Sequence, residues 1–332
     1  PADGRPKPSA DKVPKPSADK TKTKNVVPQP SADKADKADK TNNIYYYYNM
    51  IPRIIFIVPY RNRVEHKQFF TKYMEFIMED YKKEEFETYF VHQCDSRPFN
   101  RGAMKNIGFL AMCKKYPNDY KNITFVFHDV DTLPYTKNLL PYETTVGIVK
   151  HFYGFRYTLG GIFSIKGGDF EKTNGFPNFW GWGMEDNMIQ ERVITAKLQI
   201  DRTLFFPINS KSILHFADGI TKAIIKKEVA SYVNKSYPHG LNTIRNTKWA
   251  FKDEYINVTS FTTESKPSNL KFEEHNLADP ITKGEIKLTN QERYGTNDNS
   301  SLNNRINNII TRNNSNDFKS VTNPATMFKL HR

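Results

Sequence analysis

Only two cysteines, Cys94 and Cys113, occur among the 332 residues of this sequence. They exclude a disulfide framework, and no CxxC or Cys/His spacing indicates a zinc site. A single disulfide between the two is possible, but two reduced, partly buried thiols are the expected state. Long apolar runs are missing too, since none reaches the roughly 18–20 residues that a membrane-spanning helix needs. The N-terminal residues also lack the apolar core of a signal peptide, so we expect a soluble chain, from which an upstream segment could have been removed.

Blocks of consecutive basic residues are absent as well, although the formal net charge is +13. Residues 1–50 carry ten Lys/Arg against six Asp/Glu, residues 51–265 carry 29 against 23, and residues 266–332 carry ten against seven. This thinly spread excess lacks the basic arm typical of nucleic-acid binders, so we expect no nucleic-acid partner. A moderately basic middle suits an anionic small substrate such as a nucleotide diphosphate, or is simply a basic surface.

The two ends of the chain are polar and poor in large apolar residues. The tail over 266–332 contains 13 Asn. Near the other end, the unit PSADK occurs at 8–12, 16–20 and 30–34. A five-residue polar unit cannot bury enough apolar area to fold. We therefore predict a disordered tether over 1–50, an ordered domain over 51–265 and a largely disordered tail over 266–332.

Short apolar segments alternate with helical periodicity in the middle of the chain. Strands that alternate with helices predict an α/β sheet, mostly parallel and flanked by helices. Ligands of such sheets bind beyond the carboxyl ends of the strands. The polar clusters RNR, FNR and HDVD fall at those ends, which indicates a ligand site there. The predicted strands are Arg53–Tyr60, Thr88–Cys94 and Ile123–His128, and the predicted helices are 65–82 and Arg101–Tyr116.

Acidic and basic clusters follow the predicted strands. Asp129 and Asp131 flank Val130, whose side chain should turn into the core, and carboxylates of this kind suit Mg²⁺ or Mn²⁺ bound to a diphosphate. An isolated Asp-x-Asp is more often a capped turn. The segments 59–63 and 99–101 each combine an aromatic ring with arginine, which can bind phosphate oxygens beside a nucleobase. Two such clusters after consecutive strands favour a nucleotide site over ordinary surface arginines.

The segment Phe179–Asp186, FWGWGMED, holds two of the three tryptophans and ends in two acids. Aromatic faces stack on sugar rings and carboxylates accept sugar hydroxyls, so the segment suits a sugar acceptor. A carboxylate in that setting can remove the proton of a hydroxyl nucleophile. The alternative is a packed Trp corner whose acids precede the helical pattern at Met188–Leu198.

Two further features are weak when taken alone. The pair Gly160–Gly161 permits a tight turn or a close approach of the backbone to a ligand. His215 follows a predicted strand at Lys211–Leu214, where a histidine is most often structural. Beside an Asp-x-Asp, His215 becomes a candidate metal ligand.

In chain order, these clusters resemble the family 7 β-1,4-galactosyltransferases, which have the GT-A fold, a Rossmann-like mixed sheet flanked by helices. HDVD and FWGWG are nearest the branch that galactosylates xylose on proteoglycan cores. The resemblance implies a Mn²⁺-dependent, inverting transfer of galactose or GalNAc from a UDP-sugar to a glycan or glycoprotein hydroxyl, with a β-1,4-type linkage. The matching segments are VPYRNR at 58–63, FNRGAMKNIGF at 99–109, FHDVD at 127–131, GG at 160–161, NGFPNFWGWGMED at 174–186, His215 and GLNT at 240–243.

The resemblance also implies a role for each matching residue. Asp131 and His215 would ligate the metal, with Asp129 supporting the ribose and the geometry of the site. Glu185 would bind donor hydroxyls, and Asp186 would be the general base. The acceptor would contact Trp182, Gly183 and Asp186. The UDP-sugar would be held by Pro59, Tyr60, Arg61, Arg63, Phe99, Arg101, Asp129, Val130, Gly161 and Trp182.

Three positions depart from the family pattern. Ser212 stands where many members have a metal-binding Met, and Asn187 replaces the third acid of an EDD run. Thr158 stands where galactose-specific members usually have Tyr, so it would leave room for the N-acetyl group of GalNAc. The first two departures favour an alternative, a catalytically inactive sugar- or nucleotide-binding module tethered to a larger, even viral, assembly. Family members work in the Golgi lumen. Because no anchor is visible in this sequence, a location in the cytoplasm or in a viral factory is an alternative.

Overall fold

The computed structural model describes residues 51–277, apart from 217–218, 220 and 235–236. The predicted tether over 1–50 and the tail from 278 onward lie outside the described residues. Before residue 277, the structure has a short helix η3 (Pro267–Asn269) and strand β13 (Glu273–Asn276). Regular structure therefore continues past residue 265, where the sequence predicts the tail to begin.

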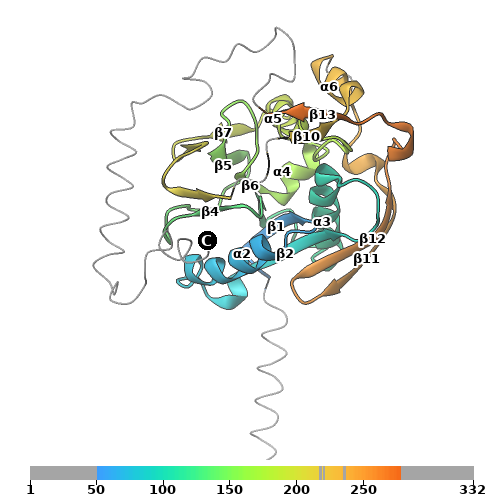
Figure 1. The fold of residues 1–332 in the computed structure, drawn as a ribbon. Helices are drawn as coiled ribbons and strands as arrows, with labels where there is room; N and C mark the ends of the chain where they lie inside the picture. The colour runs from blue at the N-terminus through green and yellow to red at the C-terminus, as the bar shows by residue number, and fades with distance from the viewer. Residues whose placement is uncertain (1–50, 217–218, 220, 235–236, 278–332) are drawn as a thin grey trace, which may run out of the picture. The chain divides into compact units, whose positions relative to one another are not determined.

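A mixed β-sheet forms the centre of the described part (Figure 1). Its strand order is β11-β12-β2-β1-β3-β6-β5-β7, with β8 paired to β5. The three predicted strands are its middle, and β1 runs parallel to both β2 and β3. The sheet is less parallel than the alternation of elements suggests, because β6 returns antiparallel beside β3. These central strands are β1 (Ile54–Tyr60), β2 (Phe86–Gln93), β3 (Thr124–His128) and β6 (Ile162–Lys166).

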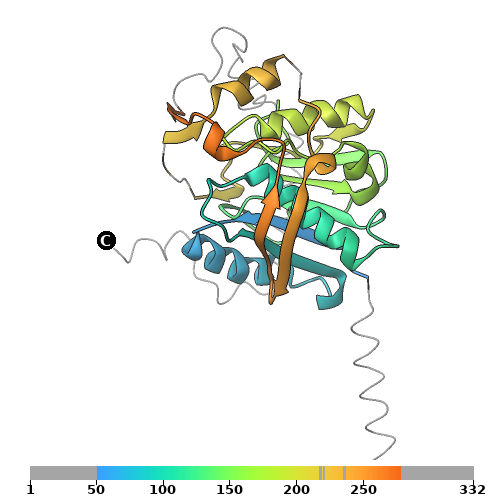
Figure 2. The same cartoon turned by 90° about the vertical axis from the view of Figure 1, so that its right-hand side faces the viewer.

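The remaining strands extend the edges of this sheet or form two small sheets of their own. In Figure 2 the hairpin of β11 (Arg245–Lys252) and β12 (Tyr255–Thr262) runs across the front of the view. It adds to the edge at β2, where β12 lies parallel to that strand. The other edge carries β5 (Ile148–Gly154), β7 (Gln199–Asp201) and β8 (Phe206–Pro207). The small sheets pair β4 (Thr132–Pro134) with β9 (Ile213–His215), and β10 (Thr221–Ile224) with β13.

Both faces of the central strands are covered, which explains why all seven residues of β1 are buried. Ile55 and Ile57 belong to the hydrophobic cluster that contains the buried face of α3 (Arg101–Lys115). Ile54, Phe56 and Val58 point the other way, into the cluster with α2 (Val64–Ile77). The helices α4 (Gly167–Lys172) and α5 (Glu185–Thr195) pack on the side of α3. The other helical segments are α6 (Lys226–Val233), η1 (Lys83–Glu85) and η2 (Leu241–Thr243).

The start of α3 is closely tied to the tryptophan segment. Asn100 caps the helix, because its side chain accepts the Ala103 N–H at 2.8 Å, and its amide donates to the Asn178 carbonyl at 3.0 Å. A Cβ on Gly102 would lie 2.1 Å from the Pro177 carbonyl oxygen, so only glycine lets the two segments approach this closely. The fold therefore brings FWGWGMED to the amino end of α3.

Neither cysteine forms a disulfide. Cys113 is half-buried as expected, whereas Cys94 is exposed, since it lies just beyond the end of β2. None of the helices within the described ranges combines the length and apolar character needed to cross a bilayer.

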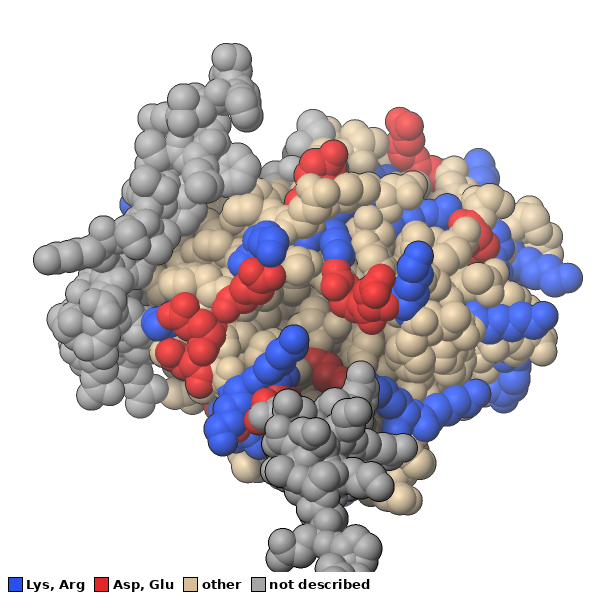
Figure 3. All heavy atoms as spheres, turned by 90° about the horizontal axis from the view of Figure 1, so that it is seen from below, with Lys and Arg blue, Asp and Glu red and all other residues tan. Residues whose placement is uncertain are grey.

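Charge of both signs occurs on the surface that Figure 3 shows. Acidic and basic side chains lie near one another around a hollow close to the centre of that view, and apolar or neutral surface separates many of them. This mixture agrees with the interspersed acids and bases of the sequence.

Candidate active site

Acidic side chains from two separate parts of the chain meet at the first residue of α3. Arg101 Nη1 donates to Glu185 Oε1 at 2.6 Å and to Asp186 Oδ2 at 2.9 Å. Its Nη2 donates to Asp129 Oδ1. Asp129 follows β3, whereas the other two acids begin α5. Residues that the sequence assigns to three different motifs thus converge on one guanidinium group.

Lys105, which the sequence motifs do not single out, completes this cluster. Its Nζ lies 3.1 Å from Asp186 Oδ1, and its side chain is 1% exposed. It stands four residues after Arg101, a spacing that places two side chains on the same face of a helix. That spacing is the one sequence signal that could have drawn attention to Lys105.

Burial and mutual charge perturb the acids of the cluster. Burial raises the pKa of Glu185, and the negative charge of Asp186 raises it further. Burial would also raise the pKa of Asp129, but Arg101 and Lys105 outweigh it and hold that pKa below its usual value. The pKa of Asp131 is raised by burial and by the nearby Asp129. The surroundings of the cluster therefore favour the charged form of Asp129 and disfavour the charged form of Glu185.

The two predicted metal ligands lie at the paired strands β4 and β9, with Asp131 directly before β4 and His215 at the end of β9. His215 is the last residue of β9 and stands opposite Thr132 of β4, while the Phe216 N–H donates to the Asp131 carbonyl at 2.8 Å. His215 Nδ1 is 3.0 Å from the Tyr153 hydroxyl, which leaves Nε2 as the nitrogen for a metal. Carboxylate oxygen and imidazole nitrogen suit Mn²⁺. Within the described residues no group of three or more His, Cys, Asp or Glu could hold a metal, so these two would share it with substrate oxygens or water.

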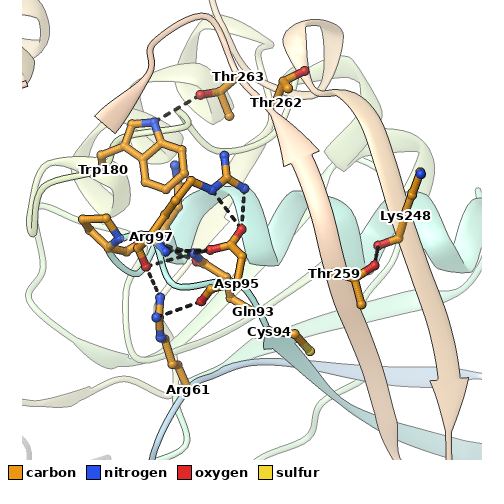
Figure 4. Close-up of polar contacts among 12 residues, drawn as sticks. Arg61, Gln93, Cys94, Asp95, Arg97, Trp180, Lys248, Thr259, Thr262 and Thr263 are labelled. Carbon is orange, nitrogen blue, oxygen red and sulfur yellow. Dashed lines mark hydrogen bonds and ion pairs between the residues drawn. The ribbon is translucent and has the colours of Figure 1, made fainter. Parts of the chain in front are cut away.

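The arginines of the first cluster take different positions. Arg63 Nη1 lies 3.7 Å from Asp131 Oδ2, beside the predicted metal ligands. Arg61 instead donates to the backbone carbonyls of Asp95, at 2.9 Å, and of Arg97, in the loop after β2 (Figure 4). Arg61 supports that loop in this structure, and its contact with donor phosphates stays a prediction.

The remaining donor residues are largely covered by the core. The Tyr60 ring is 5% exposed and packs against His92 and Tyr255, with ring centroids 5.3 and 5.7 Å away. Little of that ring is left for a nucleobase. Val130 is buried, as the sequence predicts. Pro59 is buried in β1, and Phe99 is half-buried against the core.

The two tryptophans of FWGWGMED have opposite environments. Trp180 is 2% exposed, stacks on Phe261 with centroids 5.5 Å apart, and donates its indole N–H to the Ser265 carbonyl at 3.0 Å. Arg97 covers the same ring, 4.9 Å from its centroid (Figure 4). Trp182 is 39% exposed. Trp180 is therefore the packed corner of the alternative interpretation, and Trp182 is available to a ligand.

Glu228 of α6 holds the backbone between these tryptophans, although nothing in the sequence points to it. Its carboxylate accepts the N–H of Trp180 at 2.9 Å and of Gly181 at 2.8 Å. A Cβ on Gly181 would lie 2.7 Å from the Ile225 nitrogen, so glycine is needed for this approach. Burial raises the pKa of Glu228 from its usual 4.5 to about 7.

The raised pKa makes a testable prediction about stability. Folded Glu228 binds its proton more tightly than the unfolded chain does, so its contribution to the free energy of unfolding is greatest below pH 4.5 and is lost as pH rises towards 7. Between pH 4.5 and pH 7, the free energy of unfolding of the wild type should fall by about 3 kcal/mol relative to that of Glu228→Gln. Urea unfolding of both proteins across this range measures the difference. A constant difference at every pH would contradict the prediction.

The first of the paired glycines lies directly against Asp186, the predicted base. A Cβ on Gly160 would be 2.6 Å from Asp186 Oδ2, and Gly161 has φ +67°, which favours glycine. The Leu159 N–H donates to the Asp186 carbonyl at 2.8 Å, and the Asp129 N–H donates to the Gly161 carbonyl at 3.0 Å. The GG motif therefore connects the Asp-x-Asp segment with the start of α5.

The buried His151 contacts the backbone of the Gly160–Gly161 turn. His151 Nε2 lies 3.1 Å from the Gly160 carbonyl oxygen, and Arg202 Nε donates to His151 Nδ1 at 3.0 Å. Burial, followed by the charge of Arg202, lowers the pKa of His151 to about 3, so the ring is neutral. Thr158 is also buried, and its hydroxyl donates to the Phe155 carbonyl at 3.2 Å. Its role in donor choice stays a prediction.

Comparison with protein families finds two consecutive matches. The family model described as the N-terminal region of glycosyl transferase group 7 matches residues 48–142, and the model described as the N-terminal domain of galactosyltransferase matches 143–216. Together they cover 48–216, from β1 to the residue after His215. Every motif that carries the resemblance, apart from GLNT, lies inside this span.

Curated relatives and a solved structure are also similar. β-1,4-Galactosyltransferase 4 of Cricetulus griseus is 32% identical over 161 residues, which cover 46% of this chain and 45% of that protein. β-1,4-Galactosyltransferase 6 of Homo sapiens is 31% identical over 202 residues, covering 58% and 52%. The chain thus spans about half the length of these relatives.

The solved catalytic domain of Drosophila β-1,4-galactosyltransferase 7, in complex with xylobiose, aligns with a TM-score of 0.50. It shares 22% sequence identity and covers 66% of this chain and 97% of the solved domain. At this identity the likeness concerns the fold, and it confirms the predicted GT-A architecture.

Proposed function

Because the chain belongs to the group 7 glycosyltransferases, we propose that it transfers galactose from UDP-galactose to a hydroxyl group of a sugar acceptor. The observation that carries this proposal is the meeting of Asp129, Glu185 and Asp186 on Arg101. Relatives named β-1,4-galactosyltransferases support it, as does a solved mutant of the Drosophila relative that is described in complex with manganese, UDP-Gal and xylobiose. We further propose a β-1,4-type linkage, a glycan or glycoprotein acceptor, and residues 51–277 as the catalytic unit.

Asp131 and His215 would hold the Mn²⁺, and their carboxylate and imidazole donors fit that ion. Bound there, the metal supplies positive charge that stabilises the leaving diphosphate. Arg63, 3.7 Å from Asp131, lies where it would add a second positive charge to the same phosphates. Ser212 supplies no strong metal ligand, so the site relies on these two side chains and on substrate oxygens.

Asp186 acts as the general base in this proposal. Its carboxylate takes the proton of the acceptor hydroxyl while that oxygen bonds to the anomeric carbon from the face opposite the diphosphate. The bond to the diphosphate breaks at the same time, and its electron pair leaves with UDP. This single displacement inverts the anomeric carbon.

Glu185 is suited to hold the donor sugar. One of its oxygens, Oε1, accepts from Arg101, whereas Oε2 is buried and has no hydrogen-bond partner within the described residues. A buried acceptor without a partner is unfavourable, and a donor hydroxyl would satisfy it. The exposed ring of Trp182 and the adjacent Gly183 then offer a surface for the acceptor sugar.

Thr158 leaves the choice of donor to experiment, because a small residue there would admit GalNAc as well as galactose. A screen of UDP-sugars against sugar acceptors, followed by UDP release, tests the proposed function. Release should require Mn²⁺ and an added acceptor, and EDTA should reduce it to background. Asp131→Asn should weaken the response to Mn²⁺, whereas Asp253→Asn, in the exposed β11–β12 turn, should not.

One outcome of this screen would favour the alternative function. If calorimetry shows that a UDP-sugar binds but no acceptor on a broad panel is glycosylated, the chain is a binding module and not a transferase. The substitutions at Ser212 and Asn187 would then account for the lost activity.

A further inference from the structure

Lys105 is a buried cation that the proposed roles leave unused. Its side chain is 1% exposed, and Nζ lies 4.5 Å from the centroid of the Phe176 ring. Placing an ammonium group in such a site is unfavourable unless an anion pairs with it. An apolar residue of similar length would fill the same space without that penalty. The charge of Lys105 therefore needs a specific partner.

That partner is the carboxylate of Asp186. Lys105 Nζ lies 3.1 Å from Asp186 Oδ1, closer than the 3.9 Å that separates it from Asp129 Oδ1. Arg101 donates to the other oxygen of Asp186, Oδ2, at 2.9 Å. The two cations hold both oxygens of one carboxylate, which restricts its rotation more than either contact alone.

The surroundings of Asp186 limit its movement further. Gly160 lies against Oδ2, where even a Cβ would approach to 2.6 Å. The backbone carbonyl of Asp186 accepts the Leu159 N–H at 2.8 Å. Arg101 divides its contacts among three carboxylates, whereas the acid closest to Lys105 is Asp186. Removing Lys105 would release one oxygen of this acid and leave the other contacts in place.

We propose that Lys105 is a positioning residue for the transfer reaction, holding the Asp186 carboxylate in the orientation that takes the acceptor proton; this inference rests on the proposed function. Lys105 transfers no proton in the proposed step. The acceptor proton moves to Asp186, the acceptor oxygen bonds to the anomeric carbon, and the electron pair of the broken bond leaves with UDP. Lys105 is thus neither the base nor a nucleophile.

Two substitutions separate positioning from simple packing. Lys105→Met removes the charge and fills the space, and should lower kcat about 100-fold because the base is no longer held in place. Lys105→Gln keeps an N–H that can donate to Oδ1, so it should lose less activity than Lys105→Met. The KM for the UDP-sugar and the Kd for UDP with Mn²⁺ should stay within about threefold. Lys114→Met, an exposed lysine on the same helix, is the matched control.

The remaining outcomes contradict either the positioning role of Lys105 or the proposed function. Wild-type kcat in Lys105→Met, or equal losses in the Gln and Met variants, would remove the positioning role. So would a loss of UDP affinity that parallels the loss of kcat. If Lys105→Met does not fold, as thermal unfolding would show, Lys105→Gln carries the test by its kcat and UDP affinity. A wild-type chain that transfers no sugar contradicts the proposed function itself, whereas an active wild type with unaffected variants overturns only the role of Lys105.

Discussion

Asp186→Asn is expected to lower kcat by about 10²–10⁴-fold, because an amide cannot take the acceptor proton. Asn preserves the size of the side chain, and its single amide oxygen can accept from Arg101 or from Lys105, but not from both. The cluster loses one contact and should remain folded. The Kd for UDP with Mn²⁺ should therefore change little. Steady-state kinetics, with the acceptor that the screen identifies, and calorimetry measure these two quantities separately.

Asp253→Asn is a matched control for this experiment. Asp253 is exposed in the β11–β12 turn and has φ +52°, a conformation that Asn also adopts readily. The control should retain wild-type kcat. Normal transfer by Asp186→Asn would show that another group removes the proton. Glu185 would be tested next, because it is the neighbouring acid and its pKa is raised by burial and by Asp186.

Arg101→Met should both destabilise the protein and abolish transfer. The substitution leaves Asp129, Glu185 and Asp186 without their shared guanidinium, and three mostly buried carboxylates then repel one another. Removing one partner of a buried ionic cluster costs about 3–5 kcal/mol, and the value here should lie near the lower limit, since Arg101 is 22% exposed. Urea unfolding monitored by circular dichroism measures this loss in the free energy of unfolding.

A second substitution tests whether charge is the cause of that loss. Adding Asp129→Asn to Arg101→Met removes the carboxylate whose pKa is lowered and whose charge the cluster favours, so it should recover part of the lost stability. Arg245→Met, an exposed arginine on β11, should have little effect and serves as the control. A loss for Arg101→Met no larger than that of Arg245→Met would mean that the cluster does not stabilise the fold.

The local patterns of the sequence were enough to predict the central elements. β1, β2, β3 and α3 begin and end within two residues of their predicted limits, because strands buried on both faces form apolar runs and α3 has its own N-cap at Asn100. Helix α2 ends at Ile77 and not near residue 82, since a turn precedes η1. The apolar periodicity of the sequence was not sufficient to predict where α2 ends.

Convergence of the motifs also follows from local reasoning, since parallel strands end at the same edge of a sheet. The residue pattern of FWGWGMED predicts a sugar-binding segment without distinguishing its two tryptophans, and only the family resemblance implies a role for Trp182. In the tertiary structure Trp180 stacks on Phe261, 81 residues away, and Trp182 stays 39% exposed.

The chemical partners of the buried charged residues were decided by the tertiary structure alone. Lys105 and Glu228 do not stand out in the sequence, because one is a lysine on an amphipathic helix and the other an acid in the first turn of another. Their roles arise from contacts with Asp186 and with the backbone of Trp180, which are distant in the chain. The sequence by itself thus determined which residues are proposed for the site and at which edge of the sheet they lie. Only the packing of α3, α5 and α6 decided which side chains hold Asp186 and the tryptophan segment in place, because such contacts depend on how helices meet and not on spacing along the chain.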